Sequence, residues 1–408
     1  MLHSGCIPYR LSEVKRIWRR NRCLGRASLI AYQYWLHRFA TYCKTHSLDQ
    51  RAELTQQGSE RFARWWRSQG SRRHGQLRYT IAQSHHALRA WAFALSMLGE
   101  PLPPWTVSST TPAVDDRFQA FVDYLREVRG NPASTIHKKI AQLMAFHRYR
   151  RSRRASGLTI RLSEIDAYIV TCRRRFARTT VADICSTIRG YLRFLHATGA
   201  MKADLAPSVK APSVRTAERP HRTLPWGDVQ RILRAVDRTT PTGRRDYALL
   251  LMMSVYGLGA GEVIALSLDA IDWRAMVVRV ERPKTGAVFY LPLLPAVARA
   301  LTDYLRRGRP VHTPTRHLFV TMMTPFKRLA CSVTVRHILH SAALRAGVTA
   351  PFLGTHALRH THACRQLELG VPPKIIGDIL GHRDPDSTSA YLRVTSDRLR
   401  ELSLPVPV

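Results

Sequence analysis

The sequence predicts a mainly α-helical protein with one small antiparallel β-sheet, in which helical N-terminal domains precede a mixed C-terminal domain. Its 408 residues are enough for two or three domains, each with its own core. Apolar residues recur at helical spacing over most of residues 1–208, whereas only residues 276–281 and 287–293 are β-rich. We therefore expect a helical module at 1–110, a second helical domain at 111–208, a linker at 209–221 and a C-terminal domain at 222–408.

The helical half shows two matches between distant segments. Residues 28–43 place five large apolar side chains on one face, at positions 29, 32, 36, 39 and 42. Ile136, Leu143, Phe146 and Tyr149 repeat four of these positions 107 residues later, and residues 188–199 match 88–99 at an offset of 100. Two amphipathic helices can match through periodicity alone, so a tandem repeat and a coincidence both stay open.

The C-terminal half changes character after a linker rich in Pro, Ser and basic residues, at 206–225. The hairpin turn RPKTG separates the two β-rich runs, and HLFV at 317–320 is a candidate third strand. The expected helices are 226–236, 246–256, 293–306 and 333–346, followed by helical segments after Gly354 that are interrupted at 370–373 and 381–382.

The charge of the chain points to nucleic acid as its partner. Sixty-four Lys and Arg against 28 Asp and Glu give a net charge of +36, and 55 of the basic residues are arginine, which grips phosphate with paired hydrogen bonds. Two basic clusters are the candidate contacts with DNA phosphates: Lys138, Lys139, Arg148, Arg150 and Arg151, and Arg173, Arg174 and Arg175. The alternative is that these clusters are solvated helix faces. Residues 1–110 are either a second DNA-binding module or a protein–protein arm.

Several other classes of protein are disfavoured. The seven cysteines are scattered without a Cys-x-x-Cys pair, which predicts reduced thiols, and the longest charge-free apolar run, 247–261, is too short to span a membrane. The N-terminus lacks the apolar stretch of a signal peptide, so we expect a cytoplasmic protein. His356, His360 and His362 have no acidic residue nearby to complete a metal site, and no metal is expected.

Residues 355–394 carry the most specific pattern. His356 and Arg359 are three residues apart, so on a helix both can reach one phosphate. Leu380-Gly381-His382 follows, and Tyr391 lies nine residues beyond His382. A phenol beside such a cationic set is a candidate nucleophile, although a surface tyrosine and a helix-capping histidine are the simpler readings.

These motifs resemble the catalytic domain of tyrosine recombinases, the phage-integrase family, over residues 222–398. His356, Arg359, His382 and Tyr391 fall on that family's His-x-x-Arg, Leu-Gly-His and Tyr pattern. Lys284 falls on the family's lysine in the hairpin, and residues 247–273, including Glu262, match its first conserved box.

The resemblance implies cleavage of DNA without a metal or nucleotide cofactor. Tyr391 would attack the scissile phosphate to form a 3′-phosphotyrosyl link, and Lys284 would protonate the leaving 5′-oxygen. Arg359 would bind the non-bridging oxygens, with His356 and His382 in support. The resemblance further implies a helical core-binding domain that closes a clamp on double-stranded DNA, and assembly with other protomers or related recombinases, as a tetramer on DNA.

The first box departs from the family at one position. It reads Gly257-Leu258-Gly259 where the family has Gly-Leu-Arg, so the first catalytic arginine is absent from its place. Arg244 and Arg245 are conceivable substitutes. The leading interpretation is a site-specific recombinase or integrase of a mobile element, the alternative is a catalytically silent recombinase-derived DNA-binding protein or accessory subunit, and a topoisomerase-like relaxing activity comes third.

Overall fold

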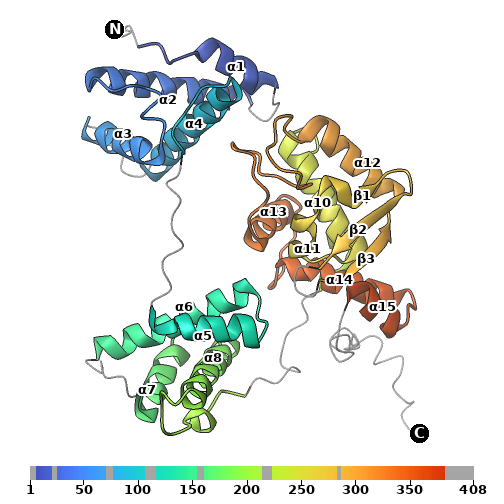
Figure 1. The fold of residues 1–408 in the computed structure, drawn as a ribbon. Helices are drawn as coiled ribbons and strands as arrows, with labels where there is room; N and C mark the ends of the chain where they lie inside the picture. Colours follow the sequence, from blue (N-terminus) through green and yellow to red (C-terminus); the bar gives the residue numbers. More distant parts are fainter. Residues whose placement is uncertain are drawn as a thin grey trace. The chain divides into compact units, whose positions relative to one another are not determined.

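The computed structural model describes residues 6–20, 25–69, 77–105, 116–153, 160–213, 223–282 and 286–381 (Figure 1). Contacts divide the chain into two units, one formed by residues 1–107 with 222–408 and the other by residues 108–221. In the described residues, buried apolar side chains form three large clusters, within residues 11–95, 118–209 and 224–358. The predicted fold class is confirmed, because helices dominate and the described strands form one small antiparallel sheet.

The described residues of the N-terminal module form four helices. They are α1 (Leu11–Arg20), α2 (Arg26–Thr45), α3 (Gln56–Ser68) and α4 (Leu77–Met97). The Thr55 side chain caps α3 by accepting a hydrogen bond of 2.9 Å from the Gly58 amide. Apolar residues at helical spacing point into one core, where Trp18, Phe39 and Trp91 are fully buried.

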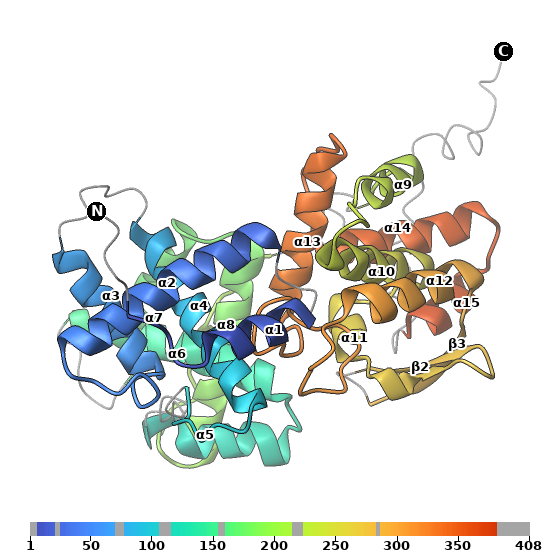
Figure 2. The same cartoon turned by 90° about the horizontal axis from the view of Figure 1, so that it is seen from above.

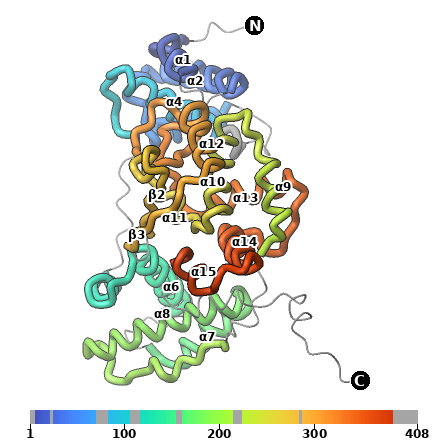
Figure 3. The backbone as a smooth tube through the Cα atoms, turned by 90° about the vertical axis from the view of Figure 1, so that its right-hand side faces the viewer, coloured from blue at the N-terminus to red at the C-terminus, as the bar shows by residue number. Residues whose placement is uncertain are grey.

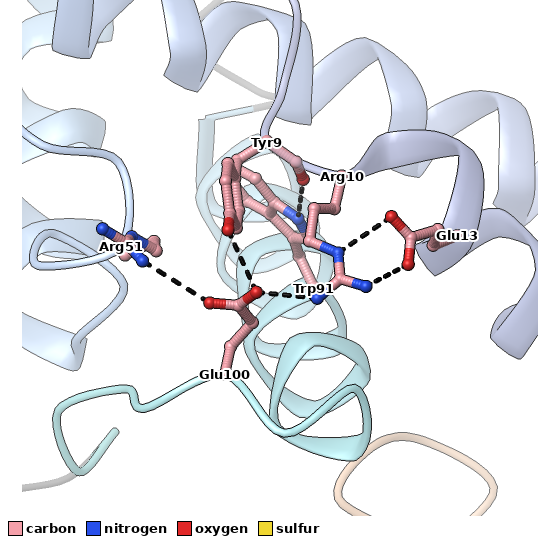
Figure 4. A network of polar contacts seen from close by, with 6 residues as sticks. All are labelled: Tyr9, Arg10, Glu13, Arg51, Trp91 and Glu100. Atoms are coloured by element: carbon pink, nitrogen blue, oxygen red, sulfur yellow. Dashed lines mark hydrogen bonds and ion pairs between the residues drawn. The ribbon is translucent and has the colours of Figure 1, made fainter.

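A polar network fixes the N-terminal segment to the end of α4 (Figure 4). The Glu100 carboxylate accepts hydrogen bonds from Arg10 Nη1 at 2.7 Å and from the Tyr9 hydroxyl at 3.0 Å, and Arg51 lies 3.5 Å away. The Trp91 indole N–H donates to the Tyr9 carbonyl at 3.2 Å. Arg10 and Tyr9 hold the pKa of Glu100 below its usual range, so this carboxylate stays charged in the folded module.

The unit at 108–221 is a second set of helices. It contains the short turns η2 (Asp116–Phe118), α5 (Gln119–Asp123) and η3 (Tyr124–Val128), and the helices α6 (Ala133–Ser152), α7 (Leu162–Arg173), α8 (Arg178–Ala197) and η4 (Ala206–Ser208). The expected linker begins inside this unit, because Val209 is buried in its core and the Lys210 carbonyl lies 3.8 Å from Cys185 Sγ. Val209 and Ala211 therefore pack against the core of this unit.

The C-terminal domain surrounds α10 (Figure 2). Its helices are α9 (Trp226–Arg234), α10 (Pro241–Tyr256), α11 (Ala260–Ala265), α12 (Pro295–Asp303), α13 (Ser332–Arg345), α14 (Thr355–Glu368) and α15 (Pro373–Leu380), with the turns η6 (Leu268–Ala270) and η7 (Tyr304–Gly308). The apolar helix expected at 246–256 begins five residues earlier, because the Thr240 side chain caps it and Pro241 suits its first turn.

The sheet has the order β1-β2-β3 and is antiparallel throughout. β2 (Val277–Glu281) and β3 (Val288–Pro292) form the predicted hairpin, with Val278 paired to Leu291. The third strand is β1 (Ile271–Asp272), so the expectation of a strand at 317–320 is wrong. His317 and Val320 make only single bridges, to Ser267 and Arg328, because that segment has no extended partner.

Three further features concern membrane spans, metal sites and thiols. None of the helices in the described residues combines the length and apolar character that crossing a bilayer requires. In those residues, no three side chains of His, Cys, Asp or Glu gather closely enough to hold a metal ion. The six cysteines within the described ranges are free thiols, of which Cys43, Cys172 and Cys185 are buried.

Candidate active site

The motif segments singled out in the sequence meet at the carboxylate of Glu262. Glu262 lies in the first turn of α11, and its Oε2 accepts a hydrogen bond of 2.7 Å from the Gly259 amide. This places the carboxylate at the start of the helix, where unpaired amides favour negative charge. The same oxygen lies 3.1 Å from Arg359 Nη1. The first box and the His-x-x-Arg segment, about a hundred residues apart, thus share one ion pair.

Arg359 also joins a third motif. It projects from α14, and its Nη2 donates to the Leu380 carbonyl at the end of α15 while its Nη1 donates to the Gly257 carbonyl at 3.3 Å. Leu380 opens the Leu-Gly-His motif, so Arg359 ties the first box to that motif. The two helices α14 and α15 lie side by side (Figure 3). The guanidinium is mostly buried, with 14% of its side chain exposed.

Arg282 is a second guanidinium in this cluster, and no sequence motif singles it out. It follows β2, and its Nη1 and Nη2 donate to the carbonyls of Leu380 and Ile379, the latter at 2.8 Å. Its Nε lies 3.8 Å from Glu262 Oε1, and its Cζ lies 4.4 Å from the centre of the Phe289 ring. Burial lowers the pKa of Arg282, which is only 6% exposed.

Gly259 stands beside these charged groups. A Cβ at this position would lie 3.4 Å from Glu262 Oε2 and 3.7 Å from Arg359 Nη1. Position 259 therefore faces the cluster, and a long side chain there would start next to both charges.

The two substitutes suggested by the sequence do not serve this site. Arg244 pairs with Asp303 at 3.0 Å, and buried Arg245 pairs with Asp246 and donates to the Val320 carbonyl. Both lie near the start of α10, roughly 18 Å along the helix from Gly257 at about 1.5 Å per residue. The suggestion that either replaces the missing arginine is wrong.

The histidines of α14 lie in different environments. His356 is exposed one turn before Arg359, and its ring is 6.5 Å from that of His360. His362 is buried, with Nδ1 3.3 Å from the Ser254 carbonyl and no hydrogen-bond partner at Nε2 among the described residues. Burial, and secondarily the Arg359 charge, lowers the pKa of His362, so its ring is neutral.

Three of the predicted site residues, Lys284, His382 and Tyr391, lie outside the described residues. The described chain leads directly to two of them, since Arg282 precedes Lys284 by two positions and Gly381 immediately precedes His382. Gly381 adopts a left-handed conformation with φ of 60°, which ends α15 and turns the chain at the Arg282–Arg359 cluster.

The predicted DNA-contacting residues are mostly at the surface of α6 and α7. Lys138, Arg148, Arg151, Arg173, Arg174 and Arg175 are exposed, and Lys139 is half-buried. Lys138 lies 2.8 Å from Asp183 in an exposed ion pair. Arg150 differs: it is buried, and its Nε pairs with Glu164 at 2.9 Å. Arg150 is therefore no longer proposed as a phosphate contact, because its guanidinium is buried in an ion pair with Glu164.

Family models match both helical and C-terminal parts of this chain. The phage integrase family matches residues 222–398, and the N-terminal SAM-like domain of phage integrases matches residues 118–199. The protein y4rA of Sinorhizobium fredii, which is named as an integrase/recombinase, is 32% identical over 72% of each chain. The chain belongs to the phage integrase family.

Three further matches have lower sequence identity. XerD of Shewanella oneidensis is 26% identical over 71% of this chain and 95% of its own. A lambda integrase dimer bound to a COC′ core site matches 81% of this chain and 90% of its own, with a TM-score of 0.53 and 19% identity. The Tn1549 transposon integrase in complex with circular intermediate DNA matches 70% and 98%, with a TM-score of 0.52 and 16% identity. These solved structures share the fold of this member of the phage integrase family.

Proposed function

We propose that this protein is a site-specific DNA recombinase of a mobile element that cleaves and rejoins strands through a 3′-phosphotyrosyl intermediate. The observation that carries the proposal is the meeting of three motif segments, in which Arg359 contacts Glu262 and the Leu380 carbonyl. Such preorganised donors act on charge that develops on phosphate oxygens, which is usually the largest contribution to catalysis in reactions of this kind.

In the proposed reaction the Tyr391 oxygen attacks the scissile phosphorus and the bond to the 5′-oxygen breaks. Lys284 gives a proton to that oxygen, which leaves as a 5′-hydroxyl. Arg359 holds the non-bridging oxygens, and His356 and His382 support those oxygens or take up the proton that the Tyr391 hydroxyl loses. Religation reverses these steps with the 5′-hydroxyl of a partner strand, so the phosphoester energy is retained in the protein–DNA bond and no cofactor is required.

The proposal includes the domains and partners. Residues 1–110 are a helical N-terminal module, 111–208 are the helical core-binding domain, and 222–408 is the catalytic domain. Double-stranded DNA is the substrate, and several protomers assemble on it, because exchange needs more than one cleaved strand. The dimeric lambda integrase and a lambda integrase tetramer bound to a Holliday junction are family structures of that kind.

Gly259 favours a second function. By the resemblance to the family's first box, Gly259 stands where the family has its first catalytic arginine, which makes a silent DNA-binding subunit the alternative. The two functions differ in whether this chain forms a covalent bond with DNA.

The deciding experiment incubates the protein with duplexes that carry the ends of its own element. We expect a covalent protein–DNA adduct that Tyr391→Phe abolishes, with specific binding kept within a few-fold because one hydroxyl is lost from a surface dominated by phosphate contacts. Tyr290→Phe is the matched control, since Tyr290 is an exposed tyrosine on β3. Binding without any adduct supports the silent subunit, and an adduct that survives Tyr391→Phe refutes the assigned nucleophile.

A further inference from the structure

The burial of Arg282 has to be explained by its surroundings. Arginine is seldom buried unless it is paired, and among the described residues its carboxylate partner is Glu262, which Arg359 already contacts. Its other partners are two main-chain carbonyls at the end of α15. Gly381 makes room for this arrangement, because a Cβ there would overlap the Arg282 guanidinium.

The charges of the cluster show what Arg282 contributes. Arg282 and Arg359 carry two positive charges and Glu262 one negative charge, so the three groups together are cationic. Without Arg282, Glu262 would neutralise Arg359, and the cluster would have no surplus charge for an anion. Opposite charges within a few ångströms interact strongly where water is excluded.

Building on the proposed function, we propose that Arg282 is a positioning residue that restores the positive charge missing at Gly259. It acts through Glu262 and through the Leu380–Gly381 turn, keeping Arg359 effective toward a phosphate. An arginine at position 259 would begin 3.4 Å from Glu262 and 3.7 Å from Arg359, so it can take the same role from the other side.

The test is a rescue experiment on the full chain. We expect Arg282→Gln to lower the rate of adduct formation by roughly 100-fold or more, as loss of one preorganised cationic donor does. Arg282→Lys should lose less. Gly259→Arg alone should lower the rate, because it crowds a third cation into the cluster, whereas Gly259→Arg in the Arg282→Gln background should recover at least about tenfold.

Arg309→Gln is the matched control, since Arg309 also donates to main-chain carbonyls, those of Thr315 and His317, but away from the site. If Arg282 only stabilises the end of α15, Arg282→Gln will lower the midpoint of urea unfolding and Gly259→Arg will not rescue activity. That result overturns the proposal.

A second readout separates this inference from the proposed function. If the wild-type chain forms no adduct, binding of inorganic phosphate, measured by calorimetry, decides the role of Arg282. A cationic cluster predicts about tenfold weaker phosphate binding in Arg282→Gln and recovery in the double variant. Equal affinity in wild type and Arg282→Gln contradicts the proposal whatever the outcome with DNA.

An independent observation concerns the N-terminal module, whose helices repeat those of the unit at 108–221. The three long helices match in order and length: α2 and α6 have 20 residues each, α3 and α7 have 13 and 12, and α4 and α8 have 21 and 20. Gly99 and Gly199, with φ of 80° and 74°, follow the last helix of each set.

The buried positions coincide as well. In α1 and the turns that precede α6, the buried residues at an offset of 107 are Leu11, Val14 and Trp18, matched by Phe118, Phe121 and Leu125. In α3 and α7, at an offset of 106, buried Ser59, Phe62 and Ala63 match buried Ile165, Tyr168 and Ile169, whereas buried Gly58 and Cys172 have half-buried equivalents. These helices were not part of the matches seen in the sequence.

Contacts between helices exclude a coincidence of periodicity. Phe39 and Phe62 lie 5.4 Å apart between ring centres, and the equivalent Phe146 and Tyr168 lie 5.2 Å apart. Tyr42 also contacts Phe62, at 5.6 Å, as Tyr149 contacts Tyr168, at 5.1 Å. A helical period fixes which residues face inward but not which pairs meet across helices.

We infer that residues 6–105 are a second SAM-like domain, beyond the one matched at 118–199, and that it binds the phosphates of duplex DNA. Exposed basic residues recur at equivalent places, Lys44 with Arg151 and Arg67 with Arg173. Residues 1–107 carry 17 Lys and Arg against five Asp and Glu, which suits a polyanion. This inference holds for an active recombinase and for a silent subunit alike.

The test measures how binding of the full chain to a random-sequence duplex depends on salt between about 50 and 200 mM. Each phosphate contact contributes close to one to the slope of log affinity against log salt concentration. We expect Lys44→Gln/Arg67→Gln to lower the slope by about two, and Arg151→Gln/Arg173→Gln to do the same. Arg26→Gln/Arg64→Gln is the control, because the equivalent positions are Ala133 and Val170.

A wild-type slope for Lys44→Gln/Arg67→Gln, beside a reduced slope for Arg151→Gln/Arg173→Gln, would show that the first module does not bind DNA. An equal reduction in the control would show that only net charge matters, and it would equally overturn the assigned face. The adduct assay is separate from this measurement, so failure of the proposed chemistry leaves the result readable.

Discussion

At the scale of single residues, His362 links the stability of the catalytic domain to pH. Its ring projects from α14 and is buried beside the Ser254 carbonyl of α10. Its pKa lies below the ordinary value because burial disfavours the imidazolium. Above the unfolded pKa of about 6.5 both states are neutral. As the pH falls below that value, the unfolded chain takes up a proton that the folded chain refuses, so stability is lost.

We therefore expect the free energy of unfolding in urea to fall between pH 7.5 and 5.5, and to fall less in His362→Gln. Glutamine keeps a donor for the Ser254 carbonyl but does not titrate. His137→Gln, at an exposed position on α6, is the control and should follow the wild type. An unchanged pH dependence in His362→Gln would show that His362 does not set it.

At the scale of helices and strands, the sequence predicts those elements whose signal lies within one short segment. Residues 333–346 and the hairpin strands were found from apolar periodicity and β-branched runs, and the structure has α13 at Ser332–Arg345 and β2 paired with β3. The strand expected at 317–320 failed, because a short apolar run becomes a strand only if another extended segment lies alongside. The start of α10 was missed because its cap, Thr240, lies before the apolar pattern begins.

The candidate active site likewise combines residues that one segment predicts with residues that only long-range contacts bring in. The spacing of His356, Arg359 and Leu380-Gly381 could be read from one segment, since these residues lie within two adjacent helices. Arg282 could not, because its contact with Leu380 joins residues 98 positions apart and RPK reads as an ordinary turn. The burial of Arg150 was likewise hidden, since its partner Glu164 belongs to the next helix.

At the scale of the whole molecule, the larger buried clusters of the described residues are separate cores, each closed by its own helices. The tryptophans are unevenly placed among them. Of the eight, six lie at positions 18–105 and two at 226 and 273, and residues 108–221 have none. Tryptophan fluorescence therefore reports on the first module and the catalytic domain, whereas far-ultraviolet circular dichroism reports on helices everywhere.

We expect unfolding in urea to give different midpoints by the two methods. Residues 108–221 form a unit with its own core, and such a unit can unfold without the rest. Glu164→Gln sharpens the test, because it removes the carboxylate charge that pairs with the buried Arg150 guanidinium and should destabilise this unit by about 3–5 kcal/mol. The part of the circular-dichroism change that comes from residues 108–221 should then move to lower urea concentration, while the fluorescence midpoint stays unchanged. Coincident curves in both proteins, moving together, would show that the cores unfold as one cooperative system.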